Sequence, residues 1–100
     1  MKKLILTALF STVLMHSQAY AGDVQNGKSL YGSCMGCHGS NAEGVVGPQL
    51  SGQTADELTV KLNIYRDGGV RGSMSSMMQP MAKGLSDADI DDLTTYISSL

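Results

Sequence analysis

The chain contains no tryptophan and few other large aromatic side chains. Its one phenylalanine, Phe10, lies near the start, and beyond residue 21 the only aromatic residues are Tyr31, Tyr65 and Tyr96. A domain this small buries a modest share of its surface and often needs a further stabilising element, such as a disulfide or a bound metal. We therefore expect something other than side chains to fill much of the interior.

The longest apolar run lies at the start of the chain. Two lysines precede the uncharged residues 4–15, and the Ala-Tyr-Ala at 19–21 has the small-x-small pattern of a signal-peptidase site. The run is too short to span a bilayer comfortably, so a transmembrane helix or a retained anchor is the weaker interpretation. We predict a secretory signal peptide, residues 1–21, and one mature domain, residues 22–100, that is exported and is not an integral membrane protein.

Basic residues are scarce in this mature domain. It has 9 acidic side chains against 5 basic ones, which gives a net charge of −4. The basic residues are Lys28, Lys61, Arg66, Arg71 and Lys83. This balance disfavours nucleic acid and anionic membrane surfaces as partners, because both attract basic proteins. It is compatible with docking on a basic patch of another protein, or with a solvated surface that steers nothing.

The chain has only two cysteines, and both lie in the string Cys34-Met35-Gly36-Cys37-His38. A disulfide across so small a loop would constrain the unfolded chain little. A thioredoxin-like redox site would need a βαβ context, and no strand pattern surrounds the string. A zinc site needs about four protein ligands, whereas two Cys and one His are present here.

The histidine directly after the second cysteine separates these alternatives. Cys-x-x-Cys-His is the attachment signature of haem c. Two thiols at this spacing can each add to one vinyl group of a haem, and the adjacent imidazole then reaches the iron from the same stretch of backbone. Export agrees, because bacteria attach haem c outside the cytoplasm. We predict one haem c joined through thioethers to Cys34 and Cys37, with His38 as an iron ligand, in the periplasm; a chance string with an idle disulfide is the alternative.

The other axial ligand of the iron is expected to be a methionine. His38 is the only histidine beyond residue 21, and His or Met usually completes the coordination of such an iron. Met35 lies between the cysteines, too close to reach the far face of the haem. Four further methionines crowd residues 74–81. Because methionine is a flexible filler of apolar gaps, we expect most of them to pack around the haem and one to bind iron.

Three main helices are predicted, and no alternating pattern of useful length indicates a strand, so the fold class is all-α. Each helix begins after a residue that can cap a helix N-terminus: Asp23, Thr54 and Ser86. The first is expected to end near Ser33, and Asp67-Gly68-Gly69 to stop the second. The third carries the apolar stripe Ile90, Leu93, Ile97 and Leu100. Residues 39–52 are expected to form a loop, and the methionine segment a short irregular connection.

The order of these parts resembles the class I cytochromes c, in particular the small monohaem bacterial forms and the half-domains of dihaem cytochromes c. The resemblance covers residues 22–100. It rests on Gly27, Tyr31, the Cys-x-x-Cys-His string, Gly47-Pro48-Gln49-Leu50, Met77-Met78-Gln79-Pro80-Met81, Leu85-Ser86, Leu93 and Tyr96. It implies the cytochrome c fold, with three main helices around one covalently bound haem and the first and last helices crossing at right angles.

The resemblance also implies roles for single residues. In the family, a loop proline accepts a hydrogen bond from the ligating histidine, which implies that Pro48 supports His38. In similar sequences the axial methionine lies eight positions before the serine that opens the last helix, which implies Met78. Met81 is the second choice for this ligand and Met77 the third.

In function, the resemblance implies a periplasmic single-electron carrier, not an enzyme, that works as a monomer. Its donor and acceptor would be a quinol-oxidising complex and a terminal oxidase or reductase. One alternative is the cytochrome subunit of a periplasmic dehydrogenase of the flavocytochrome type. Another is a ligand-binding or peroxidatic haem protein with an open iron site, against which the cluster of methionines argues.

Overall fold

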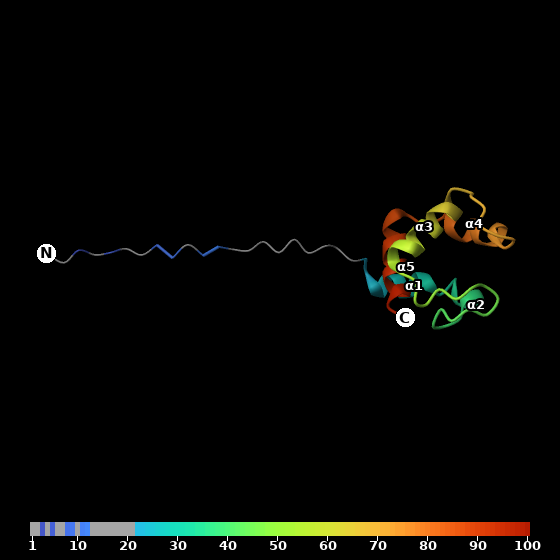
Figure 1. The fold of residues 1–100 in the computed structure, drawn as a ribbon, viewed down its shortest axis with the longest axis horizontal. Coiled ribbons are helices and arrows are strands. Elements are labelled where there is room, and N and C mark those ends of the chain that lie inside the picture. The colour runs from blue at the N-terminus through green and yellow to red at the C-terminus, as the bar shows by residue number, and fades with distance from the viewer. Residues whose placement is uncertain (1–2, 4, 6–7, 10, 13–21) are drawn as a thin grey trace.

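The structure, a computed structural model, describes residues 3, 5, 8, 9, 11, 12 and 22–100. Most of the predicted signal peptide, residues 1–21, therefore lies outside the described residues. Over the described ranges the secondary structure is helical and contains no strand, as Figure 1 shows. No helix among these residues has both the length and the apolar character needed to cross a membrane.

Five helices follow one another along the domain. They are α1 (Val24–Tyr31), α2 (Met35–His38), α3 (Ala55–Arg66), α4 (Ser75–Lys83) and α5 (Asp87–Ser98). Helix α5 contacts both α1 and α3, and α3 also contacts α4 (Figure 1). The all-α class is confirmed, and the three main predicted helices correspond to α1, α3 and α5.

The caps that start these three helices are present as predicted. Asp23 accepts hydrogen bonds from the N–H groups of Gln25 and Asn26, at 2.9 and 3.2 Å. Thr54 and Glu57 form a reciprocal capping box, with both bonds at 3.1 Å. Ser86 forms the same box with Asp89, with both bonds at 3.0 Å. Each cap satisfies N–H groups that have no partner inside the helix, which fixes where the helix begins.

The prediction of an irregular methionine segment was wrong, because residues 75–83 form helix α4. The sequence obscures this helix, since Met74 offers no capping oxygen and Pro80 lies inside the helix and lacks an N–H. The order comes from tertiary structure instead. Ser75 is buried, and its Oγ accepts hydrogen bonds from the N–H groups of Arg71 and Gly72, at 2.8 and 3.0 Å. Ala82, 1% exposed, is buried near the other end of the helix.

The ends of α1 and α5 also differ from the prediction. Helix α1 ends at Tyr31, two residues earlier than expected, because the Cys34 N–H bonds to the Tyr31 carbonyl at 2.8 Å and turns the chain into α2. Ile90, Leu93 and Ile97 are buried as predicted. Leu100, the fourth member of that stripe, follows the end of α5 and remains 36% exposed.

The contact between α1 and α5 depends on Gly27. A Cβ at this position would lie 2.0 Å from the Asp92 carbonyl oxygen and 2.8 Å from the Cβ of Tyr96. One turn further along, the rings of Tyr31 and Tyr96 meet with centroids 5.6 Å apart and planes tilted by 55°. The two helices therefore approach at Gly27, Tyr31 and Tyr96, three of the residues on which the resemblance rests.

We expect Gly27→Ala to force these two helices apart. The clash is with backbone, which cannot rotate away, so the free energy of unfolding should fall by about 1–3 kcal/mol or more. Urea unfolding followed by circular dichroism would measure the loss. The matched control is Gly84→Ala, because a Cβ there meets nothing within 4 Å. Equal stability losses in the two variants would contradict a close approach at Gly27.

Candidate cofactor site

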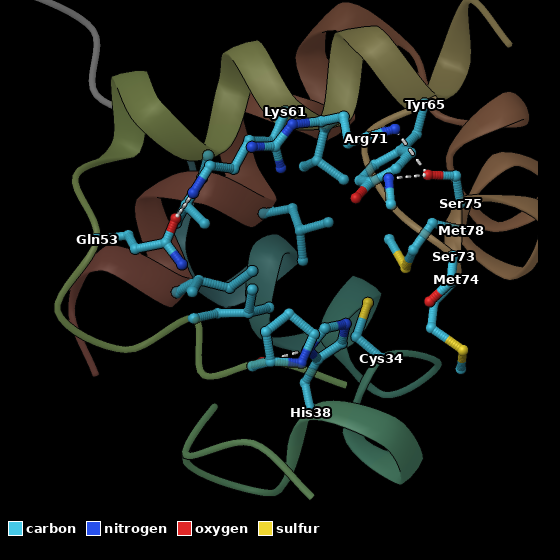
Figure 2. Close-up of a pocket in the computed structure, with 17 residues that line it drawn as sticks. Cys34, His38, Gln53, Lys61, Tyr65, Arg71, Ser73, Met74, Ser75 and Met78 are labelled. Carbon is cyan, nitrogen blue, oxygen red and sulfur yellow. Dashed lines mark hydrogen bonds between the residues drawn. The ribbon is translucent and has the colours of Figure 1, made fainter. Parts of the chain in front are cut away.

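A crevice with mostly apolar walls lies between α2, α3 and α4. Its larger part has a volume of about 420 Å³ and is shown in Figure 2. Its apolar wall is formed by Leu50, Leu58, Leu62, Met78, Leu93 and Ile97. A smaller hollow of about 150 Å³ shares Cys34, His38, Pro48, Met74 and Met78 with it, so the two are neighbouring parts of one crevice. A flat, apolar group could lie between these walls.

The structure brings all five predicted cofactor-binding residues to this crevice. Cys34, His38, Pro48 and Met78 line both parts of it, and Cys37 lines the smaller hollow. They come from three segments that are far apart in the sequence: α2 with its first flanking residue, the loop before α3, and α4. The second and third choices for the axial ligand, Met81 and Met77, line only the smaller hollow.

His38 is held in one orientation by the loop that follows α2. It is the last residue of α2 and 6% exposed, and its Nδ1 lies 2.8 Å from the carbonyl oxygen of Pro48. The carbonyl can only accept, so Nδ1 carries the proton and donates it. In the neutral imidazole the other ring nitrogen, Nε2, is then the unprotonated atom that can bind a metal.

Gly47 contributes to this arrangement in a way the sequence did not reveal. A Cβ on Gly47 would lie 2.7 Å from Cε1 of His38, so the loop backbone packs directly against the imidazole ring. The N–H of Gly47 also donates to the Cys37 carbonyl at 2.8 Å, which ties the loop to α2. The only sequence feature that could have pointed to this role is the position of Gly47 directly before Pro48.

The two thiols lie at the same helical turn. Cys34 precedes α2 and is half-buried, Cys37 lies within α2 and is exposed, and both are free cysteines. Residues three apart project from the same face of a helix, and here both line the smaller hollow. Burial raises the pKa of the Cys34 thiol, and a hydrogen bond with Ser33 opposes this shift in part.

The burial of the methionines separates Met78 from the others. Met78 is half-buried and lies on the α4 side of the larger cavity, across from the segment that carries Cys34 and His38 (Figure 2). Met74, Met77 and Met81 are 44%, 54% and 45% exposed. Of the four thioethers in this segment, that of Met78 is thus the most enclosed by the crevice.

The donor atoms at the crevice fit a haem better than a bare metal ion. Within the described ranges, no three His, Cys, Asp or Glu side chains gather in a way that could hold a metal ion. The crevice offers instead one imidazole nitrogen, one thioether facing it, two free thiols and a wide apolar wall. These match the axial ligands, the thioether links and the apolar disc of a haem c.

Tyr31 connects α1 to the residue that follows the Cys-x-x-Cys-His string. Its side chain is fully buried, and its hydroxyl donates a hydrogen bond to the carbonyl of Gly39, the residue after His38. Burial raises the pKa of the Tyr31 phenol above its ordinary value near 10, and the negative charges of Cys34 and Glu43 would act in the same direction. The folded protein therefore favours the neutral phenol.

We expect Tyr31→Phe to destabilise the protein and to flatten its response to alkali. Loss of the hydrogen bond should cost about 1 kcal/mol at neutral pH. Because the folded pKa is raised, the phenol's contribution is complete below the unfolded pKa and is lost as pH rises through the folded pKa. Urea unfolding between pH 7 and 11 should show the parent weakening more steeply above pH 10 than Tyr31→Phe. Parallel curves would contradict this assignment.

Two charged residues of the crevice were not predicted to belong to it. Lys61 and Arg71 line the larger part, together with the polar Gln53 and Ser75. Lys61 lies three residues after the buried Leu58 on α3, a spacing that places both on one helix face. That spacing was the only sequence pattern that could have placed Lys61 in the crevice. No pattern could have placed Arg71 there, because it lies in the connection before α4.

An all-α domain with Cys-x-x-Cys-His on the wall of an apolar crevice has the structure of a c-type cytochrome. The sequence model of the family Cytochrome c matches residues 24–100, and the chain belongs to this family. It is a small class I c-type cytochrome with covalently bound haem c, and it is an electron carrier, as its relatives' names indicate.

The chain is similar to cytochrome c-554(548) of Halomonas halodenitrificans, with 43% identity over 81 residues that cover 79% of this chain and 98% of the relative. It is 40% identical to cytochrome c-554(547) of Halothiobacillus neapolitanus over 90 residues, which cover 80% of this chain and 99% of the relative. A solved structure of Acidithiobacillus ferrooxidans cytochrome c4 superposes with a TM-score of 0.70 at 28% identity, covering 86% of this chain and 55% of that one. The predicted family and the cytochrome c fold are therefore confirmed.

Proposed function

We propose that this cytochrome c is a periplasmic shuttle that carries one electron at a time, with His38 and Met78 as the axial ligands of its iron and Cys34 and Cys37 as its thioether attachment sites. The observation that carries the proposal is that these four residues line one crevice, although α2 and α4 lie far apart in the sequence. When bound, the haem supplies a one-electron couple at its iron.

The residues around the iron would tune this couple and keep it rigid. The bond from His38 Nδ1 to the Pro48 carbonyl orients the imidazole and makes Nε2 a more basic ligand. As the second iron ligand, the thioether of Met78 would favour ferrous iron and raise the potential. His38 and Met78 would hold the iron from helices that are packed in the fold, so little of the surrounding chain would have to move on electron transfer.

The surface around Cys37 offers a place where a redox partner could approach. The N–H groups of Val45 and Val46 bond to the Cys37 carbonyl, and the two side chains are 70% and 63% exposed. Met77 and Met81 line the smaller hollow together with Val46, and no Lys, Arg, Asp or Glu of the described residues lines it. Such an uncharged apolar rim favours brief contacts of small area, as in other redox encounters.

Export rests on the predicted signal peptide, residues 1–21, with cleavage after Ala21. The packing of Gly22 supports a mature domain that starts there. Its N–H donates to Thr95 Oγ1 at 3.1 Å, and a Cβ on Gly22 would lie 2.3 Å from the Asp91 carbonyl oxygen, so this residue already lies against α5. Because haem c is attached outside the cytoplasm, export and cofactor attachment belong to one route.

The test is to produce the full chain in a bacterium that matures c-type cytochromes and to purify it from the periplasm. Mass spectrometry should give residues 22–100 plus one haem, and gel filtration a monomer. The reduced protein should bind carbon monoxide poorly, because both iron faces are closed. Bare polypeptide would refute the proposal, ready carbon monoxide binding would indicate an open iron, and a co-purifying flavoprotein would favour a dehydrogenase subunit.

A further inference from the structure

Lys61 and Arg71 concentrate positive charge in one part of a domain that is otherwise acidic. Among the residues that the structure describes, the ion pair is Arg66 with Asp87, at 2.7 Å, and neither Lys61 nor Arg71 takes part in one. No Asp or Glu lines either part of the crevice. Two cations and no carboxylate in the wall of one cavity make that wall attractive to an anion, despite the net charge of −4 on residues 22–100.

We propose that Lys61 and Arg71 bind the two carboxylates of the haem. This inference rests on the proposed attachment of haem at Cys34 and Cys37. The two carboxylates of a haem match the two cations of the crevice wall. A haem carries its two propionates on one edge, on pyrroles other than those that bear the vinyl groups. Once Cys34 and Cys37 fix the vinyl groups, the carboxylates must reach another wall of the crevice.

Lys61 and Arg71 lie on such a wall. Figure 2 shows both side chains along the α3 side of the cavity, while Cys34 and His38 occupy the opposite side. The ammonium group of Lys61 contacts Gln53 Oε1, and Gln53 Nε2 donates to the Gln49 carbonyl at 2.9 Å. The loop before α3 therefore holds the ammonium at the cavity wall.

Arg71 is positioned by a different set of hydrogen bonds. The N–H groups of Arg71 and Gly72 both donate to the buried Ser75 Oγ, which fixes the backbone just before α4. The two cations thus come from independently anchored segments and enter the same cavity. A guanidinium can bind a carboxylate through two parallel hydrogen bonds, and an ammonium binds it as a compact charge.

Such binding has a consequence for the iron. A carboxylate that enters a mostly apolar cavity loses hydration, and a neighbouring cation offsets that cost and keeps it ionised. The cation also offsets the negative potential that the carboxylate creates at the iron. Removal of either cation should therefore stabilise the more positive ferric state and lower the midpoint potential.

The experiment is potentiometry of the purified holoprotein with Lys61→Gln and Arg71→Gln, measured at one pH and ionic strength. Each variant should lower the equilibrium constant for reduction by about threefold to tenfold, where tenfold corresponds to about 59 mV for one electron. Lys28→Gln and Lys83→Gln remove the same charge outside the crevice, and screening should keep their effect within about twofold. The charge-preserving variants Lys61→Arg and Arg71→Lys should remain close to the parent.

Each outcome bears on the proposal. If Lys61→Gln and Arg71→Gln shift the potential no more than Lys28→Gln and Lys83→Gln do, the carboxylate site is refuted. An equal drop in the charge-preserving variants would also refute it, because it would indicate a packing effect. Mass spectrometry of the parent separates the two proposals. If haem is attached but Lys61→Gln and Arg71→Gln shift the midpoint potential no more than the controls do, only the carboxylate site is rejected. If the parent is bare polypeptide, both proposals are rejected.

Discussion

Replacing both Cys34 and Cys37 with serine will produce an exported chain whose mass is that of the bare polypeptide. A hydroxyl does not form the thioether that a thiol forms with a haem vinyl group, and the chain has no other cysteine to substitute. Each single variant retains one thiol and should retain a single thioether link, with a reduced yield of haem protein. Mass spectrometry of the periplasmic fraction measures all three directly.

The double variant should also lose much of its structure. Leu58, Leu93 and Ile97 belong to the buried core and at the same time line the cavity of about 420 Å³. Without a haem, these core residues would face empty or wet space, and an unfilled cavity destabilises in proportion to its volume. We expect far-UV circular dichroism to show a large loss of helix and no cooperative thermal transition.

The matched control is Met35→Leu, which changes a 43% exposed residue between the two cysteines and leaves both thiols in place. It should attach haem and fold like the parent. A double cysteine variant that still carried covalent haem would show that the attachment atoms have been misassigned. One that folded cooperatively without haem would show that side chains alone can close the crevice.

The parts of the fold that follow from local chemistry could be predicted from the sequence. The capping boxes at Thr54 and Ser86 each need only residues three apart, and Cys-x-x-Cys-His is contained in one helical turn. The role of Pro48 came from the family resemblance, because nothing local connects it to His38. Here the structure places the two within hydrogen-bond distance.

The parts that depend on tertiary packing could not be predicted. Helix α4 contains Pro80 and lacks a side-chain cap, and its start is held by Ser75 bonding back to the two residues Arg71 and Gly72. A serine that accepts hydrogen bonds from the preceding loop in this way leaves no recognisable sequence pattern. The same holds for Lys61 and Arg71, whose shared cavity exists only once α3 and α4 have packed together.

Met78→Ala is expected to have the largest effect on the iron of any substitution that leaves the thioethers intact. It removes the half-buried thioether that lies on both parts of the crevice. The ferric protein should lose the weak red absorption band of thioether-bound iron. The midpoint potential should fall by on the order of 100 mV, because the axial ligand is a main determinant of haem potentials. The reduced protein should now bind carbon monoxide.

Met77→Ala and Met81→Ala are the matched controls, since each removes a thioether from the same helix at a site that is about half exposed and lines only the smaller hollow. Both should keep the band and resist carbon monoxide. The outcome against Met78 is specific: if its variant keeps the band and Met81→Ala loses it, the ligand is Met81, one turn further along α4. Helix α4 would then have to shift when haem binds, because in the present structure Met78, and not Met81, is the methionine that the crevice encloses.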